Sequence, residues 1–193
     1  MDKHTIALAA YDSDWAHQFE ALKNVYVLYL KDSIKGIEHV GSTAVPYLVA
    51  KPVLDIDLII ASEAKLQEVI EVLATLGYEF RGNQGIKDRY AFRANGSTTP
   101  NIGTDRIWPK HHLYCCIENS ASLNNHITLR DALRNDPKLR EAYGQLKKEL
   151  ASRTNDIDVY IEGKSDFIAN ILLQNGFTAT EVDDIFNQNL KKT

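Results

Sequence analysis

The chain has 193 residues, of which 44% are hydrophobic and 25% are charged, and this balance is typical of a globular protein rather than a disordered one. The formal net charge of −4 gives no support to duplex nucleic acid as a partner, because phosphate neutralisation supplies most of that affinity. The longest apolar runs, 25–30 and 53–60, are too short to span a bilayer.

Two features bear on the cellular location. The sequence does not begin with a basic segment followed by a long apolar stretch, so we expect no signal peptide. The two cysteines, Cys115 and Cys116, are adjacent and cannot build a disulfide framework. A reduced, cytoplasmic protein with no membrane partner is therefore expected.

Hydrophobic spacing predicts alternating helices and strands in the first 120 residues. Ser62 stands where it can cap the second of these helices, and Gly77 where it can end it. Residues 4–10 are expected to form a short strand or an ordered arm, and residues 95–110 a long irregular loop. Helices are predicted over 13–32 and 62–76, and strands over 36–40, 53–60, 78–81, 89–94 and 111–118.

The last third of the sequence predicts only helices. Pro137 suits the first turn of one helix, and Asn175–Gly176 the end of another. The fold class is therefore α+β, a mixed sheet flanked by helices. We expect a single domain, with an α/β core over about 5–120 and a helical part over about 121–193 packed on it. The helices of that part are predicted over 121–135, 137–153, 158–175 and 179–191.

Asp55 and Asp57 stand two residues apart in the predicted strand 53–60, so their side chains share one face, roughly 6–7 Å apart along the backbone. Two carboxylates this close repel unless a cation lies between them. Mg²⁺ suits such a pair, since it favours carboxylates together with substrate phosphates. The alternative is an exposed face that carries two acids, but the neighbouring residues are aliphatic. The pair therefore predicts a catalytic magnesium site.

A glycine-serine turn precedes the acids by a spacer of twelve residues, 43–54. Glycine lets a backbone approach phosphate closely, and a serine hydroxyl with free N–H groups forms an anion nest. This order of turn, spacer and Asp-x-Asp strand resembles the nucleotidyltransferase superfamily typified by DNA polymerase beta. There the turn holds nucleotide phosphates, and the acids hold two metal ions that clamp an in-line displacement. The resemblance implies that Gly41, Ser42 and Thr43 bind phosphate.

The turn and the acid strand are part of a longer motif, Ile37–Pro46 followed by Ala50–Ile56. This motif resembles that of one family, GrpB, and the resemblance covers about residues 5–175. It implies a nucleotidyltransferase-like fold and a pocket at this central motif, and it does not specify a reaction. Shorter matching motifs are Leu76–Tyr78, Arg89–Arg93, His111–Leu113, Arg130–Arg134 and Lys164–Ile168.

Two positions depart from the family pattern. Tyr47 stands where the family usually has glycine after Val-Pro, and Tyr114 stands where it commonly has the second histidine of His-x-His. Because a phenol cannot ligate a metal as imidazole does, no role that needs this histidine is carried over. We expect Tyr114 to line the pocket.

The predicted strand 111–118 supplies further candidates on the face that carries Tyr114. His112 suits a general base or a phosphate contact, and the alternative is a hydrogen-bonded structural histidine. In an extended strand Glu118 points to the same face as His112, so it could be a third metal-binding carboxylate. It stands at the end of the strand, and the alternative is therefore a solvent-exposed terminus. No zinc is expected, because His112 and Cys116 lie about 13 Å apart by strand rise.

Basic residues flank the acid pair. Arg89 and Arg93 share one strand face and predict either a phosphate cradle or a solvated edge. Lys51, just before the acid strand, can meet phosphate or pair with an acid. Glu38 and His39 lie beside the turn and are expected to line the pocket, the alternative being a local strand pairing.

These features predict an Mg²⁺-dependent nucleotidyltransferase that uses a nucleoside triphosphate and a small-molecule acceptor. The acidic pI of about 5.9 favours a small acceptor over nucleic acid. One alternative is a binding module for a nucleotide or phosphometabolite without turnover, which the uncertain third carboxylate favours. Another is a hydrolase of phosphate esters at the same site.

Overall fold

The computed structural model describes the backbone of residues 6–190 and the side chains of residues 6–188. Five strands form one mixed sheet in the order β1-β2-β5-β4-β3. The central pair, β2 and β5, is parallel, and the other neighbouring pairs are antiparallel. The strands are β1 (Gly36–Val40), β2 (Leu54–Ile60), β3 (Tyr78–Phe80), β4 (Arg89–Ala94) and β5 (His111–Ile117).

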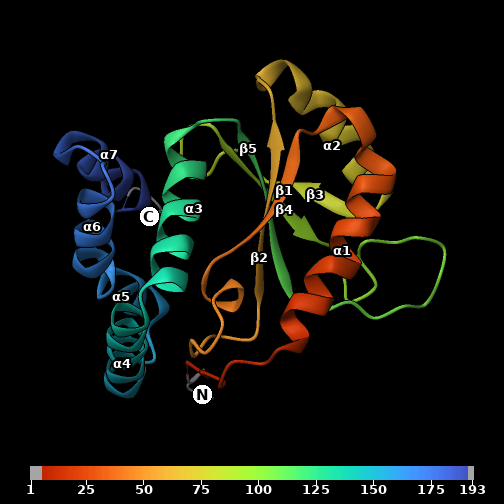
Figure 1. The fold of residues 1–193 in the computed structure, drawn as a ribbon. Helices are drawn as coiled ribbons and strands as arrows, with labels where there is room; N and C mark the ends of the chain where they lie inside the picture. Colours follow the sequence, from red (N-terminus) through yellow and green to blue (C-terminus); the bar gives the residue numbers. More distant parts are fainter. Residues whose placement is uncertain (1–5, 191–193) are drawn as a thin grey trace.

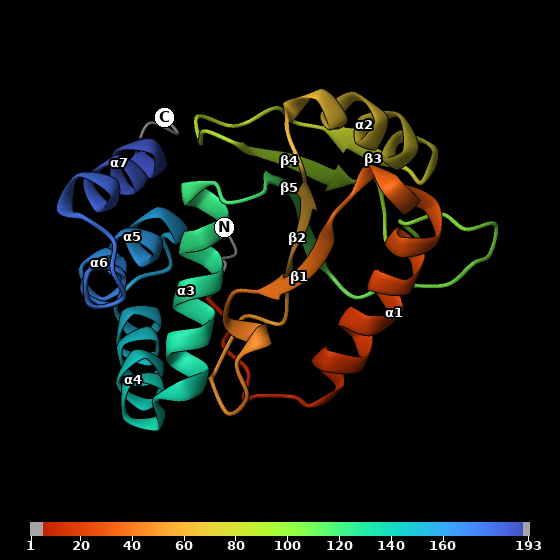
Figure 2. The same cartoon turned by 45° about the horizontal axis from the view of Figure 1, so that its top comes forward.

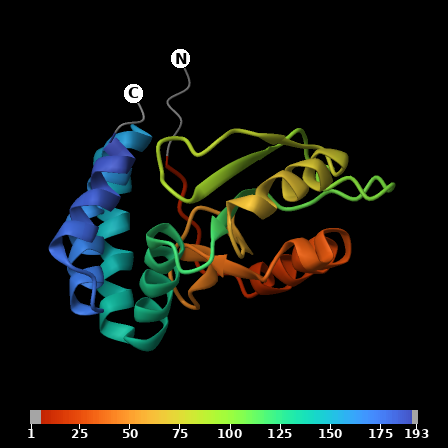
Figure 3. The same cartoon turned by 90° about the horizontal axis from the view of Figure 1, so that it is seen from above.

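Helices cover both faces of this sheet (Figure 1). The helices α1 and α2 lie on one face and α3 on the other, and α4 to α7 form an outer layer beyond α3, as the view from above also shows (Figure 3). None of the helices in residues 6–190 is long and apolar enough to cross a membrane. The bounds are α1 (Asp14–Leu30), α2 (Leu66–Thr75), α3 (Ala121–Asn135), α4 (Pro137–Arg153), α5 (Ile157–Glu162), α6 (Ser165–Gln174) and α7 (Ala179–Leu190).

The two faces of strand β2 carry chemically different side chains. Its even-numbered residues are buried in the main hydrophobic core, which α1 and α2 complete with side chains such as Trp15, Leu22 and Leu73. Because successive residues of a strand point to opposite faces, Asp55 and Asp57 point toward α3 instead. A second hydrophobic cluster joins the loop after β1 to α3, α4 and α6, and Figure 2 shows the ribbons of these elements. This cluster holds the helical layer against the acidic side of the sheet.

Most of the predicted elements are confirmed, and the α+β class with them. The predicted helix 158–175 is wrong as one element, since α5 and α6 are separated at Gly163 and Lys164. Glycine is a poor helix former, and an added Cβ at Gly163 would collide with Leu150 of α4. The helix break therefore brings the backbone of Gly163 close to the side chain of Leu150 in α4.

Smaller differences concern ends of elements. Ser62 makes no side-chain capping bond, and a 3-10 turn, Glu63–Lys65, precedes α2. Of the expected arm 4–10, residues 4 and 5 lie outside the described part, whereas Ala9 pairs with Ala50 through two backbone hydrogen bonds. Residue 191 of the last predicted helix also lies outside it.

Candidate functional site

Each carboxylate of the acid pair is hydrogen-bonded to a histidine. The strand register places His112 of β5 beside Asp55, and His112 Nδ1 lies 2.9 Å from Asp55 Oδ1. His126 Nδ1 of α3 lies 2.7 Å from Asp57 Oδ2. Asp57 is fully buried, and its second oxygen, Oδ1, has no hydrogen-bond partner among the described residues. The acids are therefore oriented by a strand neighbour and by the helix that covers them.

His126 is not among the site residues predicted from the sequence. Ser122, His126 and Arg130 recur every four residues, which puts them on one face of α3, and that face is turned to the sheet. Burial lowers the pKa of His126, but the charge of Asp57 and the hydrogen bond to it outweigh burial and raise the pKa above its ordinary value. The polar stripe of α3 is the sequence signal that indicates this residue.

The Gly41–Ser42 turn lies directly against Asp55. Gly41 has a φ of +69°, and a Cβ added there would overlap the Asp55 carboxylate. Only glycine adopts this backbone conformation without strain and leaves the room that the carboxylate occupies. The twelve-residue spacer therefore brings the turn back onto the acid strand, as the sequence motif predicts.

Lysines from the helical layer converge on the same turn. Lys147 of α4 is 2% exposed and donates hydrogen bonds to Ser42 Oγ, over 2.9 Å, and to the carbonyl of Val49. Burial, with the nearby charge of Lys164, lowers the pKa of Lys147 to about 7. Burial also lowers the pKa of Lys164 to about 8, although the charge of Asp55 acts in the opposite direction and that of Lys51 adds to the lowering.

These three amines form a cationic cluster beside the turn. Among the residues that the structure describes, no carboxylate forms an ion pair with Lys51, Lys147 or Lys164. Amines held close together without a fixed counter-ion favour a bound anion, which would restore their ordinary pKa values. The cluster thus has the charge and the position to receive phosphate at Gly41–Ser42.

Glu38, His39 and Thr43 brace the turn. Thr43 Oγ1 lies 3.0 Å from His39 Nε2, and the His39 ring stacks on Phe19 with centroids 4.7 Å apart. Burial, with the charge of Arg134, lowers the pKa of His39 to about 4, so the ring is neutral at pH 7. Arg130 of α3 pairs with Glu38 and donates to the carbonyl of His39 over 3.0 Å.

The four remaining predicted residues separate into two groups. Arg89 is 7% exposed, and its guanidinium carbon lies 4.5 Å from the ring centroid of Tyr114, which is on the acidic side of the sheet. Arg93 is exposed and pairs with Glu79 of β3 instead. Glu118 is exposed and follows the end of β5. The structure therefore brings Arg89 and Tyr114 to the acid pair and leaves Arg93 and Glu118 apart from it.

A cleft of about 350 Å³ opens beside Arg89 and His126. Its walls come from the loop before β4 with the first residue of that strand, from the start of α3 and from α7, and they include Ser122 and Asn125. Two guanidinium nitrogens of Arg89, Nε and Nη2, are buried without a hydrogen-bond partner in the described part of the chain. The volume lies in the range of small-molecule sites.

The site supplies two of the three carboxylates expected for magnesium binding. Asp55 and Asp57 supply two carboxylates, which is the protein share that Mg²⁺ takes when substrate phosphates supply the rest. In residues 6–188, a third carboxylate does not join them, since the three-residue group of close ligand atoms there is Asp57, Cys116 and His126. Tyr114 stands opposite Asp57 on the neighbouring strand.

Comparisons with known proteins identify the family and the fold. A family model described as GrpB protein matches residues 5–174. The UPF0157 protein YqkA of Bacillus subtilis (strain 168) is 29% identical over 167 residues, 86% of this chain and 46% of that protein, so the chain spans about half the length of this relative. The conserved protein GrpB from Enterococcus faecalis superposes with a TM-score of 0.72 at 28% identity, over 93% of this chain and 99% of that one.

A more distant structure shares the fold. The Cid1 poly(U) polymerase, in a crystal structure with MgGTP bound, superposes with a TM-score of 0.52 at 16% identity. The match covers 75% of this chain and 45% of the polymerase. At this identity the likeness shows a nucleotidyltransferase-like fold and nothing about substrate.

Proposed function

The chain belongs to the GrpB family, and we propose that it is a nucleotidyltransferase that moves a nucleotidyl group from a nucleoside triphosphate to a small-molecule acceptor. The observation that carries the proposal is the meeting of the Gly41–Ser42 turn, Lys147 and Asp55 at one point. Phosphoryl chemistry needs a backbone cradle, cations for the phosphates and a metal-binding carboxylate close together. These parts come from three separate segments of the chain.

The phosphate end of the site is built around the cationic cluster. Ser42 and the backbone of the turn would contact the β- and γ-phosphates, and Lys147 and Lys164 would neutralise their charge. Lys51, exposed at the mouth of the cluster, would add to this attraction. Because these amines lack a carboxylate partner in the described chain, binding a triphosphate breaks no ion pair.

The metal end is the acid pair. Asp55 and Asp57 would hold Mg²⁺ together with the nucleotide, and when bound the metal supplies charge neutralisation at the reacting phosphate. Their hydrogen bonds to His112 and His126 fix the directions of the carboxylate oxygens. Metal ligands held by such partners are typically better oriented than free side chains.

The acceptor end is the cleft beside Arg89 and His126. A volume of about 350 Å³ suits a small molecule and not a polynucleotide. Arg89, which lines this cleft, would supply positive charge to an acceptor that carries phosphate or carboxylate. His112, exposed and held through Nδ1 by Asp55, does not line this cleft, and its Nε2 would take the proton of an acceptor group that reaches from the cleft to Asp55.

A binding module without turnover is the second candidate. The observation that favours it is the position opposite Asp57 on β5, where Tyr114 offers a phenol and no carboxylate. The phosphate end of the site would serve equally well for such a module. The two candidates therefore share nucleotide binding and differ only in whether the bound nucleotide reacts.

Pyrophosphate release separates these candidates. The protein is incubated with Mg²⁺, each nucleoside triphosphate and a panel of small acceptors that carry hydroxyl or phosphate groups. Transfer predicts pyrophosphate and a nucleotidylated acceptor, both lost in Asp57→Asn. Release of inorganic phosphate alone would indicate a hydrolase, and nucleotide binding with neither product over the whole panel would favour the binding module.

A further inference from the structure

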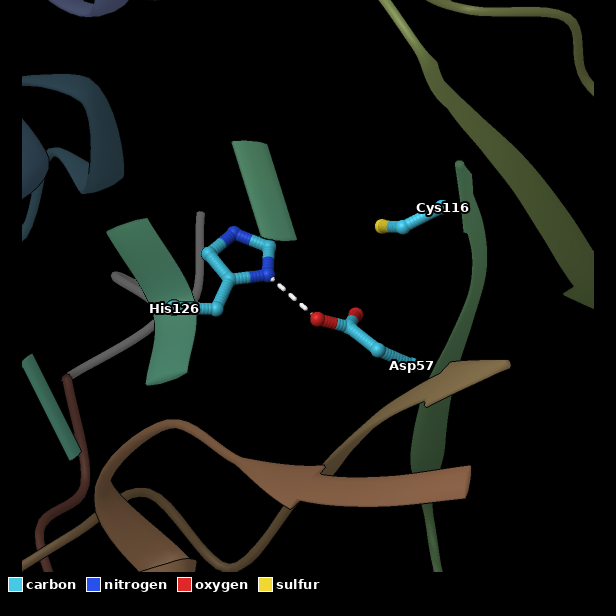
Figure 4. Close-up of side chains that lie close together, drawn as sticks. All are labelled: Asp57, Cys116 and His126. Atoms are coloured by element: carbon cyan, nitrogen blue, oxygen red, sulfur yellow. Dashed lines mark hydrogen bonds and ion pairs between the residues drawn. The ribbon is translucent and has the colours of Figure 1, made fainter. Parts of the chain in front are cut away.

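We propose that Asp57, Cys116 and His126 bind a divalent transition metal that favours sulfur ligands, namely Zn²⁺. One oxygen, sulfur or nitrogen atom from each residue lies within 4.8 Å of the other two. The three side chains come from β2, β5 and α3 and point toward one another (Figure 4). The proposal does not rest on nucleotidyl transfer, because it concerns metal binding to the protein alone.

The buried carboxylate is the first argument for a ligand here. Asp57 is fully buried, and its Oδ1 has no hydrogen-bond partner in the described part of the chain. A carboxylate oxygen that leaves water without a partner costs free energy, and a cation at this point would compensate for that cost. The other oxygen, Oδ2, is the one bonded to His126.

The kind of donor atoms decides which metal is favoured. Thiolate and imidazole ligands select zinc and related transition metals, whereas Mg²⁺ takes oxygen donors. Tetrahedral zinc, with bonds of about 2.0 to 2.3 Å, places its ligand atoms roughly 3.5 Å apart. The ligand atoms of the three residues lie within 4.8 Å of one another, so the largest separation exceeds this value by no more than about 1.3 Å.

The histidine of this cluster comes from α3. The 13 Å estimate that excludes zinc between His112 and Cys116 depends on strand rise of about 3.3 Å per residue, and it does not apply to a residue of another element. Cys115, the other cysteine, points to the opposite face of β5 and is buried in the main hydrophobic core. The two adjacent cysteines therefore stand in different surroundings, and only Cys116 reaches the cluster.

An ion has a route to this cluster, and a fourth ligand position on the metal would be open. Asp57 and Cys116 are fully buried, but His126 and Ser122 line the 350 Å³ cleft, so an ion or a fourth ligand can reach the cluster from that side. Three protein ligands and an open fourth position are the pattern of catalytic zinc sites. The charges that act on His126 are those of Arg89, which lowers its pKa, and of Asp55 and Asp57, which raise it.

Cobalt titration of the metal-free protein tests the proposal. Co²⁺ bound to a thiolate gives a sulfur-to-cobalt charge-transfer band in the near ultraviolet, which we expect at one equivalent and expect Zn²⁺, but not Mg²⁺, to displace. In Cys116→Ser the band is expected to disappear, and in His126→Gln the affinity for Zn²⁺ is expected to fall at least about tenfold. The matched control, Cys115→Ser, should keep the band.

A measurement on the unmodified protein guards against variants that fail to fold. X-ray absorption of the zinc-loaded protein should show one sulfur ligand at about 2.3 Å together with lighter ligands at about 2.0 to 2.2 Å. A coordination shell of nitrogen and oxygen alone, or no binding of Zn²⁺ or Co²⁺, would overturn the proposal. A charge-transfer band that survives in Cys116→Ser and is lost in Cys115→Ser would do the same. Neither experiment involves a nucleotide, so failure of the metal site and failure of nucleotidyl transfer are distinguishable.

Discussion

Lys147 and Ser42, which are 105 residues apart in the sequence, are joined by a hydrogen bond of 2.9 Å from the amine to the hydroxyl. This bond ties the helical layer to the glycine-serine turn. It also means that the phosphate end of the candidate site is incomplete without α4. The same amine is buried, and its lowered pKa makes it a group whose charge responds to a bound anion.

Tripolyphosphate binding at pH 8 is therefore expected to take up about one proton. At this pH Lys147, with a pKa of about 7, is mostly neutral in the free protein, and a bound anion raises its pKa and protonates it. Calorimetry in buffers of different ionisation enthalpy measures this uptake. Lys147→Met should remove most of it, and Lys148→Met, which changes the exposed neighbour, should not. Equal uptake in both variants would contradict the assignment.

Gly41→Ala is expected to lower stability by about 1–2 kcal/mol, because the left-handed backbone becomes strained and the new methyl group displaces Asp55. Affinity for the magnesium–nucleotide complex should fall at least tenfold. Urea unfolding and titration calorimetry measure the two effects. In the matched control, Gly96→Ala, the added Cβ meets nothing within 4 Å, and stability should stay within about 0.5 kcal/mol. A tolerated Gly41→Ala would mean that the turn is not packed on the acid.

Arg130→Met is expected to destabilise the fold by about 2–4 kcal/mol, since it leaves Glu38 and the carbonyl of His39 without their charged donor. Arg153→Met is the comparison, because Arg153 pairs with Glu149 only over 3.9 Å at an exposed site, where such pairs contribute less than about 0.5 kcal/mol. Free energies of unfolding, measured in urea, show whether Arg130 stabilises the turn or behaves as an ordinary surface charge. Similar losses for both variants would show that α3 does not hold the turn through Arg130.

The parts of the fold that the sequence predicts well are those fixed by local chemistry. Alternation along β2 puts Asp55 and Asp57 on one face, and the positive φ at Gly77 ends the helix where a glycine is expected. Tyr47 also has a positive φ, of 67°, which explains why glycine suits this position in the family. At these positions the backbone conformation depends on one or two residues, so the residue type at those positions is enough to predict it.

The parts that escape prediction depend on contacts between distant segments. His126 and Lys147 reach the site only because α3 and α4 fold back over the sheet, and no periodicity specifies that placement. Arg89 and Arg93 share a strand face, yet one is buried at Tyr114 and the other pairs with Glu79, because burial changes along β4. Spacing alone therefore predicts a face, and tertiary packing decides which residues on it enter the site.

Titration calorimetry with ATP, GTP and CTP, with and without Mg²⁺, is the decisive measurement for the nucleotide site. We expect at least one nucleotide to bind in a magnesium-dependent manner, and Asp55→Asn and Asp57→Asn each to weaken this binding at least about tenfold. Absence of magnesium-dependent binding, or binding that neither substitution changes, would contradict the assignment of the acid pair.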